Sequence, residues 1–253
     1  NINIDSGAKV TLWGDLVVTD NLIIRNGGNL MINGNNISVR SGNMTIEGLG
    51  FFSANSSGNI EFTGVSYLQD NNGLFSLQEL GEIYILSGAN VRLGAHIQSN
   101  GNLVVQNSAY FNTANVIING SPILENQGTV IVEGSEALPG TFSDNNSGTF
   151  LYDSVPFNLG SSQPTSFYNL TLMGNISMGN YTLNQDIAVI GSLDFSSTAN
   201  LDLDSGKTLN LHGNLTRVLN NQGFIKFIGS GNSTLPYSDS LNFGDLVIGD
   251  GTT

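Results

Sequence analysis

The residues of this sequence with the best spacing for acid–base chemistry are Asp202 and Asp204, in the segment Leu-Asp-Leu-Asp-Ser-Gly. In a strand, side chains two positions apart project from the same face, so both carboxylates would lie opposite Leu201 and Leu203. Paired carboxylates can serve general acid–base catalysis or bind calcium. The only basic residue nearby in the sequence is Lys207, which is little to hold an acidic substrate. We therefore interpret this segment as a solvated polar face and predict no catalytic residue.

Calcium is the only cofactor that the sequence leaves open. Its candidate ligands are Asp202, Asp204 and Asp250, which lie in segments sharing part of the pattern of calcium-binding turns. The complete EF-hand loop and the calcium-binding nonapeptide repeat are both missing. His96 and His212 have no further ligands at the spacing of a zinc site, and the chain contains no cysteine. We expect no resident metal and no other cofactor.

Asparagine side chains offer a second kind of chemistry, because the sequon Asn-x-Ser/Thr is the acceptor for N-glycosylation in secreted proteins. The sequon at Asn119 is followed by Pro122 and is the least favourable. The candidate glycosylation sites are Asn36, Asn43, Asn55, Asn145, Asn169, Asn175, Asn180, Asn214 and Asn232.

The charge balance limits the possible partners. The chain carries 20 acidic and 7 basic residues, a formal net charge of -13, and charged residues make up only 11% of it. Phosphate backbones are bound by clustered Lys and Arg, so we expect no nucleic acid partner. No apolar run approaches the roughly 20 residues of a membrane span, so we expect no membrane insertion. An acidic, amide-rich surface of low charge density suits a secreted protein in an extracellular or cell-surface location.

Short segments in which apolar and polar residues alternate must position all of these residues. Ile, Leu, Val and Phe recur in bursts separated by Gly and Asn, and the 32 glycines of the 253 residues mark frequent turns. The segment DSGAKVTLWGDL at 5–16 returns as DSGKTLNLHGNL at 204–215. Residues 148–172 and 223–248 are two copies of one segment about 75 positions apart, which indicates two copies of a unit of about 75 residues. We divide the chain into β-repeat regions at 1–144 and 145–253, which could form one continuous solenoid.

Close, imperfect repetition predicts an all-β fold of the β-solenoid (parallel β-helix) type, with short irregular coils of roughly 20 residues. Asparagines at equivalent corners could hydrogen-bond into ladders. A sandwich of antiparallel β-repeats is the alternative. In either fold the alternating apolar residues face inward. Those expected inside are Ile60, Phe62, Val130, Val132, Leu170, Leu172, Leu201, Leu203, Leu209 and Leu211.

The C-terminal half of the chain resembles a known family, and the first half shares this resemblance only loosely. Segments such as SFYNLTLMGNISMGNYTL and LDLDSGKTLNLHGNL resemble the Gly/Asn-rich repeats of secreted bacterial and archaeal surface adhesins. These include filamentous-haemagglutinin-like, autotransporter-like and Bacteroidota-type surface repeat proteins. The resemblance implies an elongated passive scaffold that is exported and displayed, for instance in a biofilm, and it transfers no catalytic residues.

The predicted function is that of an extracellular structural or adhesive protein and not of an enzyme. Copies of the chain would join into a homopolymer through their terminal strands, and surface glycans are a further expected partner. The residues expected to carry assembly are Ile2, Ile4, Leu246, Val247 and Ile248. Because the chain starts at Asn1 in an alternating strand, we expect a processed chain or a fragment of a longer array. The alternatives are a carbohydrate-active β-helix enzyme and a carbohydrate-binding or phage fibre module.

Overall fold

A computed structural model gives the fold of the residues that it describes. These are residues 1–48, 50–53, 58–70, 74–77, 81–120, 122–133, 138, 141–143, 147–153, 157–159, 163–173, 181–195, 199, 201–215, 220–221, 223–228 and 245–248.

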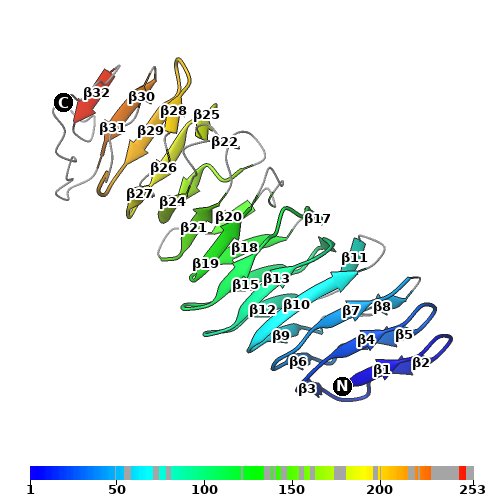
Figure 1. Ribbon diagram of the computed structural model, residues 1–253. Coiled ribbons are helices and arrows are strands. Elements are labelled where there is room, and N and C mark those ends of the chain that lie inside the picture. The colour runs from blue at the N-terminus through cyan, green and yellow to red at the C-terminus, as the bar shows by residue number, and fades with distance from the viewer. Residues whose placement is uncertain are drawn as a thin grey trace. The chain divides into compact units, whose positions relative to one another are not determined.

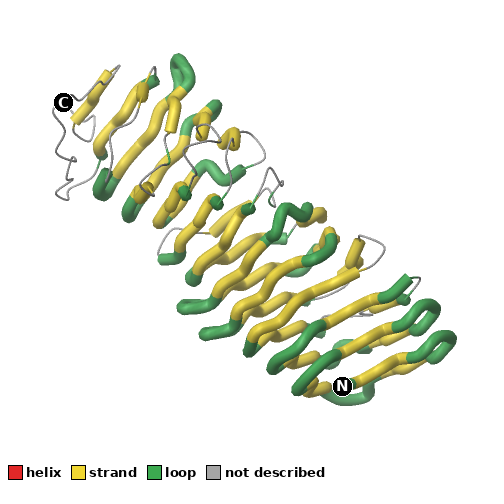
Figure 2. Tube along the Cα trace, in the orientation of Figure 1, coloured by secondary structure: helices red, strands yellow, loops and turns green. Residues whose placement is uncertain are grey.

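The described residues form strands and turns, without a helix (Figure 2). All the described strand pairs are parallel, and each strand pairs with a strand about one coil away in the sequence. Consecutive coils therefore stack on one another, which confirms the predicted β-solenoid and excludes the sandwich of antiparallel strands. The chain divides into two compact units, which we describe separately: residues 1–130 with 136–143, and residues 131–135 with 144–253.

In unit 1 each coil places one strand on each of three faces, in the same order along the chain (Figure 1). Face 1 contains β1 (Ile2–Ile4), β4 (Leu22–Ile24), β7 (Met44–Ile46), β10 (Val65–Asp70), β13 (Asn90–Leu93) and β16 (Tyr110–Asn112). Face 2 contains two three-stranded sheets, β2 (Lys9–Thr11), β5 (Asn29–Met31) and β8 (Phe51–Ser53), then β11 (Leu74–Leu77), β14 (His96–Ser99) and β17 (Ile118–Gly120). Face 3 contains β3 (Leu16–Val18), β6 (Ile37–Val39), β9 (Ile60–Phe62), β12 (Glu82–Ile85), β15 (Asn102–Val105), β18 (Ile123–Asn126) and β20 (Thr141–Ser143). The strand β19 (Thr129–Val132) spans the division between the units.

Unit 2 also places its strands on three faces. The first contains β21 (Thr149–Tyr152), β24 (Asn169–Leu172) and β27 (Leu193–Phe195). The second contains β22 (Phe157–Leu159), β25 (Tyr181–Leu183), β28 (Leu201–Leu203) and β30 (Asn220–Asn221). The third contains β23 (Ser166–Phe167), β26 (Ile187–Val189), β29 (Thr208–Leu211), β31 (Phe224–Phe227) and β32 (Asp245–Ile248).

Parallel pairing in register places like residues on top of one another, so the inward side chains form continuous apolar rows. Ile4, Ile24 and Ile46 stack in this way on face 1 and are at most 4% exposed. Burial of each such side chain contributes about 1.5–3 kcal/mol, which makes these rows the main source of stability. The alternation predicted from the sequence is confirmed, because all the residues expected inside are at most 2% exposed. These are Ile60, Phe62, Val130, Val132, Leu170, Leu172, Leu201, Leu203, Leu209 and Leu211.

The repeated segment DSG forms the same tight turn in both units. The amide of Ala8 donates to the carbonyl of Asp5 at 3.0 Å, and the amide of Lys207 donates to the carbonyl of Asp204 at 3.0 Å. The third turn residue is Gly7 in one copy and Gly206 in the other, with φ of 78° and 76°. Glycine occupies this position because a positive φ brings the Cβ of any other residue too close to the backbone.

Candidate functional site

Asp202 and Asp204, the strongest candidates for chemistry, lie in different structural settings. Asp202 is half-buried on the outer side of β28, in register with Thr182 of the coil before and Asn220 of the coil after. Asp204 is exposed in the turn that follows, where its backbone amide donates to the carbonyl of Leu183. Asp202 therefore belongs to the outward face of a strand, and Asp204 belongs to a turn. The backbone of each residue is already paired with a neighbouring coil.

Possible metal ligands are scattered in the part of the chain that the structure describes. No three His, Asp or Glu side chains converge there closely enough to hold an ion. The third calcium candidate, Asp250, lies outside the described residues. A small cavity of about 10 Å³ in the core of unit 1 is lined by apolar side chains including Ile83, Leu103 and Phe111. A space of this size is at the lower limit for a single water and offers it no polar partner.

The principal polar feature of unit 1 is a ladder of side-chain acceptors at the corner that leads into face 3. The Oδ1 atom of Asp15 accepts the amide of Asn36 at 2.8 Å, and Oδ1 of Asn36 accepts the amide of Asn59 at 3.0 Å. The Oδ1 atom of Asn59 then accepts the amide of Glu82 at 2.9 Å, and Asn102 donates to the Glu82 carboxylate at 3.4 Å. Each step joins a residue to its equivalent one coil later, 20 to 23 positions along the chain.

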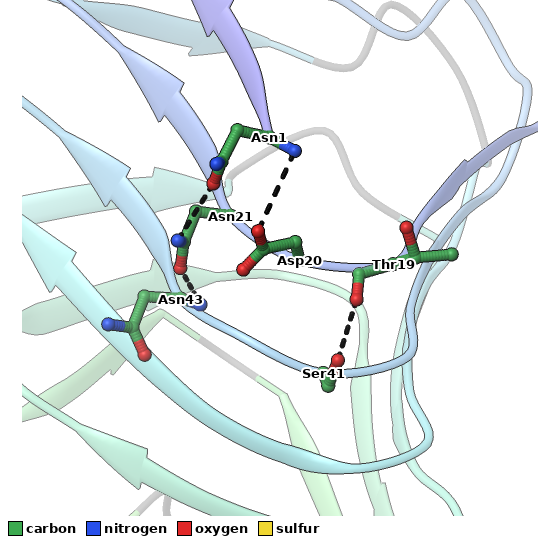
Figure 3. Close-up of polar contacts among 6 residues, drawn as sticks. All are labelled: Asn1, Thr19, Asp20, Asn21, Ser41 and Asn43. Atoms are coloured by element: carbon green, nitrogen blue, oxygen red, sulfur yellow. Dashed lines mark hydrogen bonds and ion pairs between the residues drawn. The ribbon is translucent and has the colours of Figure 1, made fainter.

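A second ladder lies at the corner that leads into face 1 (Figure 3). Asn21 donates from Nδ2 to Oδ1 of Asn1 at 2.9 Å, and its own Oδ1 accepts the amide of Asn43 at 2.8 Å. Beside it, the hydroxyl of Ser41 donates to the carbonyl of Thr19 at 2.6 Å. These bonds confirm that asparagines at equivalent corners form ladders, as the repeat pattern predicts.

Unit 2 uses the same device. The amide of Ser192 donates to Oδ1 of Asn169 at 3.0 Å, and the amide of Thr208 donates to Oδ1 of Asp186 at 2.8 Å. In each case the acceptor lies one coil before the donor, at the start of a strand or next to it. The ladder is therefore a property of the coil type and not of one region of the sequence.

The two histidines lie in unrelated places. The Nδ1 atom of His96, at the start of β14, accepts the amide of Ile117 at 2.8 Å, so an imidazole here takes the role of a ladder oxygen. His212 is exposed directly after β29, in the position that Trp13 occupies after β2, and Trp13 is 87% exposed. The rings of Trp13 and His212 thus occupy the same exposed position of the repeat, as the alignment of the two sequence segments indicates.

The asparagines of the sequons differ in how far they are buried. Asn169 uses both side-chain atoms, because its Nδ2 donates to the carbonyl of Gly148 at 3.1 Å. Asn36 is half-buried in the face 3 ladder, whereas Asn43, Asn119 and Asn214 are exposed. The remaining candidates lie outside the described residues, namely Asn55, Asn145, Asn175, Asn180 and Asn232.

One group of side chains was not predicted from the sequence. Strand register places Glu61, Tyr84 and Glu125 in one row of face 3. Val104 of β15 lies between Tyr84 and Glu125. The Tyr84 hydroxyl donates to the carboxylate of Glu82, two positions earlier on β12. This hydrogen bond, with burial and the neighbouring carboxylates, raises the pKa of Tyr84 to about 12. The three glutamates come from separate coils, so only the register between coils could reveal the group.

The predicted assembly residues lie at sheet edges. Ile2 and Ile4 pair with Leu22 and Ile24, and β1 has no other partner among the described strands. At the other edge, Leu246, Val247 and Ile248 belong to β32, which pairs with β31 alone in the described part of unit 2. The side chains of β32 lie outside the described residues.

The three-faced coils, stacked apolar rows and side-chain ladders define the chain as a β-solenoid repeat protein. No family model, no curated protein and no solved structure matches it. The described residues include no helix long and apolar enough to cross a membrane.

Proposed function

We propose that this chain is an extracellular structural or adhesive protein, and that copies of it join into a fibre through strands at the sheet edges. The observation that carries the proposal is the face 3 ladder, in which Asp15, Asn36, Asn59 and Glu82 join successive coils side by side with the backbone pairing. A stack held by both backbone and side chains suits a scaffold that bears load along its coils.

The outer surface supports the same proposal. Charged residues are few, and outward positions carry many amides and hydroxyls, so the surface can hydrogen-bond to glycans without strong charge. On face 1, Arg92 lies in register with Tyr67, and Tyr110, 49% exposed, lies in register with Asn90. Aromatic rings beside amide and guanidinium groups are suited to sugar rings, so surface glycans are the expected contact of this face.

Assembly would use the free backbone groups of the edge strands. In β1 the amide of Ile2 and the carbonyl of Ile4 bond to the second coil, at 2.7 and 2.9 Å. Strand alternation then directs the amide of Asn3 to the opposite, open side, where an added strand could accept it. We propose that a β32-edge strand of another copy occupies this position.

A single substitution separates strand addition from folding. Asn3→Pro removes the outward amide and leaves the bonds of Ile2 and Ile4 to the second coil in place, whereas Asn3→Ala keeps it. Negative-stain electron microscopy should show fibres for the wild type and Asn3→Ala and few or short fibres for Asn3→Pro. Deleting residues 1–4 should have the same effect as proline. Fibres of unchanged yield and length from both altered chains would contradict assembly through β1.

The group of carboxylates on face 3 favours one second candidate, a carbohydrate-active enzyme. Glu61, Glu82 and Glu125 could supply the acid and base of glycoside cleavage. The four strands that form this surface contain no Lys or Arg to hold an acidic sugar. Assays for reducing-sugar release from neutral and acidic polysaccharides should find no turnover. Turnover that disappears in both Glu61→Gln and Glu125→Gln would establish the enzyme and overturn the structural proposal.

A further inference from the structure

One rung of unit 1 uses a titratable nitrogen where the ladders elsewhere use oxygen. His96 begins β14, and its Nδ1 accepts the amide of Ile117 at 2.8 Å, across 21 positions. At the equivalent step of the face 3 ladder, Oδ1 of Asn36 or Asn59 accepts the corresponding amide. Nδ1 of histidine and Oδ1 of asparagine are each bonded to Cγ, so the two side chains can offer an acceptor at nearly the same point.

The strand that follows this hydrogen bond, β17, is paired on one side only in the described residues. Within the described residues of face 2, β17 is the outermost strand of its sheet and pairs with β14 alone. Besides the strand register, the junction has the bond from the amide of Ile97 to the carbonyl of Ile117, at 3.0 Å. The preceding turn contains Ala114 and Asn115 in the left-handed region, with φ of 52° and 61°. The rung at His96 thus helps to anchor an edge strand next to an unfavourable turn.

Within the described residues, Tyr67 brings a titratable hydroxyl against Gly94, two positions before His96. The strands β11, β14 and β17 contain no titratable residue other than His96. The turn from Thr113 to Ile117, which contacts it, is also uncharged. The nearest charged residue earlier in the same coil is Arg92, which lies on face 1. The proton on His96 therefore acts mainly through its own hydrogen bond.

We propose that protonation of His96 opens the junction between β14 and β17, so that one coil of unit 1 loosens in mild acid. Neutral imidazole has one nitrogen free to accept, whereas in imidazolium both nitrogens carry hydrogen and neither can accept. The amide of Ile117 would then face another donor. Histidine changes charge between about pH 5 and 8, a range in which asparagine does not titrate and aspartate is already ionised. As the pH falls, this rung is lost before those of Asn36 and Asn59.

The opened strand exposes an apolar residue to a partner. Ile118, the first residue of β17, is only 5% exposed in the closed coil, and Ile117 beside it is already 38% exposed. Acid would thus uncover Ile118 and the paired edge of β14, to which another strand could add.

Amide hydrogen exchange measured by NMR, corrected for intrinsic rates, tests the proposal directly. Between pH 7 and pH 5 the protection of Ile117 should fall about fivefold, the factor expected for the loss of one hydrogen bond. In His96→Asn the protection should stay at its neutral-pH level, and in His212→Asn it should fall as in the wild type. The amide of Glu82, which is bonded to Asn59, serves as an internal reference and should not change.

Two outcomes would overturn the proposal. One is an Ile117 protection that does not depend on pH in the wild type, and the other is an equal fall in His96→Asn. Should His96→Asn not fold, long-range nitrogen–proton correlation of the wild-type imidazole decides the question. A hydrogen on Nδ1 at neutral pH would refute the proposal, and a bare Nδ1 that becomes protonated as Ile117 loses protection would support it.

Discussion

The contribution of the face 3 ladder can be measured at Asn59, which lies in the middle of it. Its Oδ1 accepts the amide of Glu82 at 2.9 Å, while its own amide donates to Asn36. Asn59→Ala removes the acceptor of Glu82 and leaves the backbone pairing of β9 and β12 intact. The net contribution of such a bond is about 1 kcal/mol, and a buried orphan amide would cost about 1–3 kcal/mol. Because Asn59 and Glu82 are half-buried, water can partly replace the lost acceptor, and we expect about 1 kcal/mol.

Urea denaturation followed by circular dichroism provides the global measurement, and hydrogen exchange at Glu82 provides the local one. A solenoid unfolds coil by coil, so the local loss should appear at Glu82 even where the global midpoint moves little. The control is Asn90→Ala, because Asn90 is exposed on face 1 and no side-chain hydrogen bond is described for it. The stability loss of the double variant Asn36→Ala/Asn59→Ala should differ by about 0.5 kcal/mol, in either direction, from the sum of the two single losses. The two hydrogen bonds share Asn59, so their contributions are coupled. Equal stabilities and equal Glu82 protection in Asn59→Ala and Asn90→Ala would refute the role given to the ladder.

Three further outcomes are expected. The pKa of Tyr84 is raised to about 12, so the fold favours its neutral phenol; this contribution is complete below about pH 10 and is lost as the pH rises through about 12. Ultraviolet difference absorbance should show one tyrosine titrating near pH 12 in the wild type and at lower pH in Glu82→Gln, and an unchanged curve would contradict the assignment. Ser66 is 4% exposed and no partner for its hydroxyl is found in the described residues, so Ser66→Ala should keep or raise the urea midpoint; a clear loss would reveal a bond to that hydroxyl. Gly206→Ala should lose about 1–2 kcal/mol in thermal unfolding because of the positive φ, whereas Ser205→Ala in the same turn should lose almost nothing, and equal losses would exclude backbone strain as the cause.

The sequence predicts the parts of this fold that depend on nearest neighbours. Alternation identifies inward residues such as Leu201 and Leu203, and the repeated DSG segment identifies a turn that recurs with the same hydrogen bond. Both follow from local rules, because strand period and the conformational freedom of glycine act within a few residues.

What could not be predicted depends on the register between coils. Coil length varies, from 16 positions between Thr208 and Phe224 to 25 between Val65 and Asn90, so sequence spacing does not show which outward residues become neighbours. Glu61 and Glu125 fall in one row only once the lengths of the intervening coils are known. Asp204 is a separate case: it was expected beside Asp202 on a strand, and it lies in the following turn because β28 ends at Leu203.

The variation in coil length also has a consequence for protein engineering. Asn1, Asn21 and Asn43 remain joined although 20 positions separate the first pair and 22 the second. The corners between faces therefore absorb added residues while the strands and their rungs keep their alignment. A foreign peptide inserted in an exposed corner, for example after Gly14, should be displayed without shifting the coils on either side. The distance between two such insertions would be set by the number of coils between them, at about 4.8 Å for each coil. Ligands could therefore be presented on the solenoid at chosen separations.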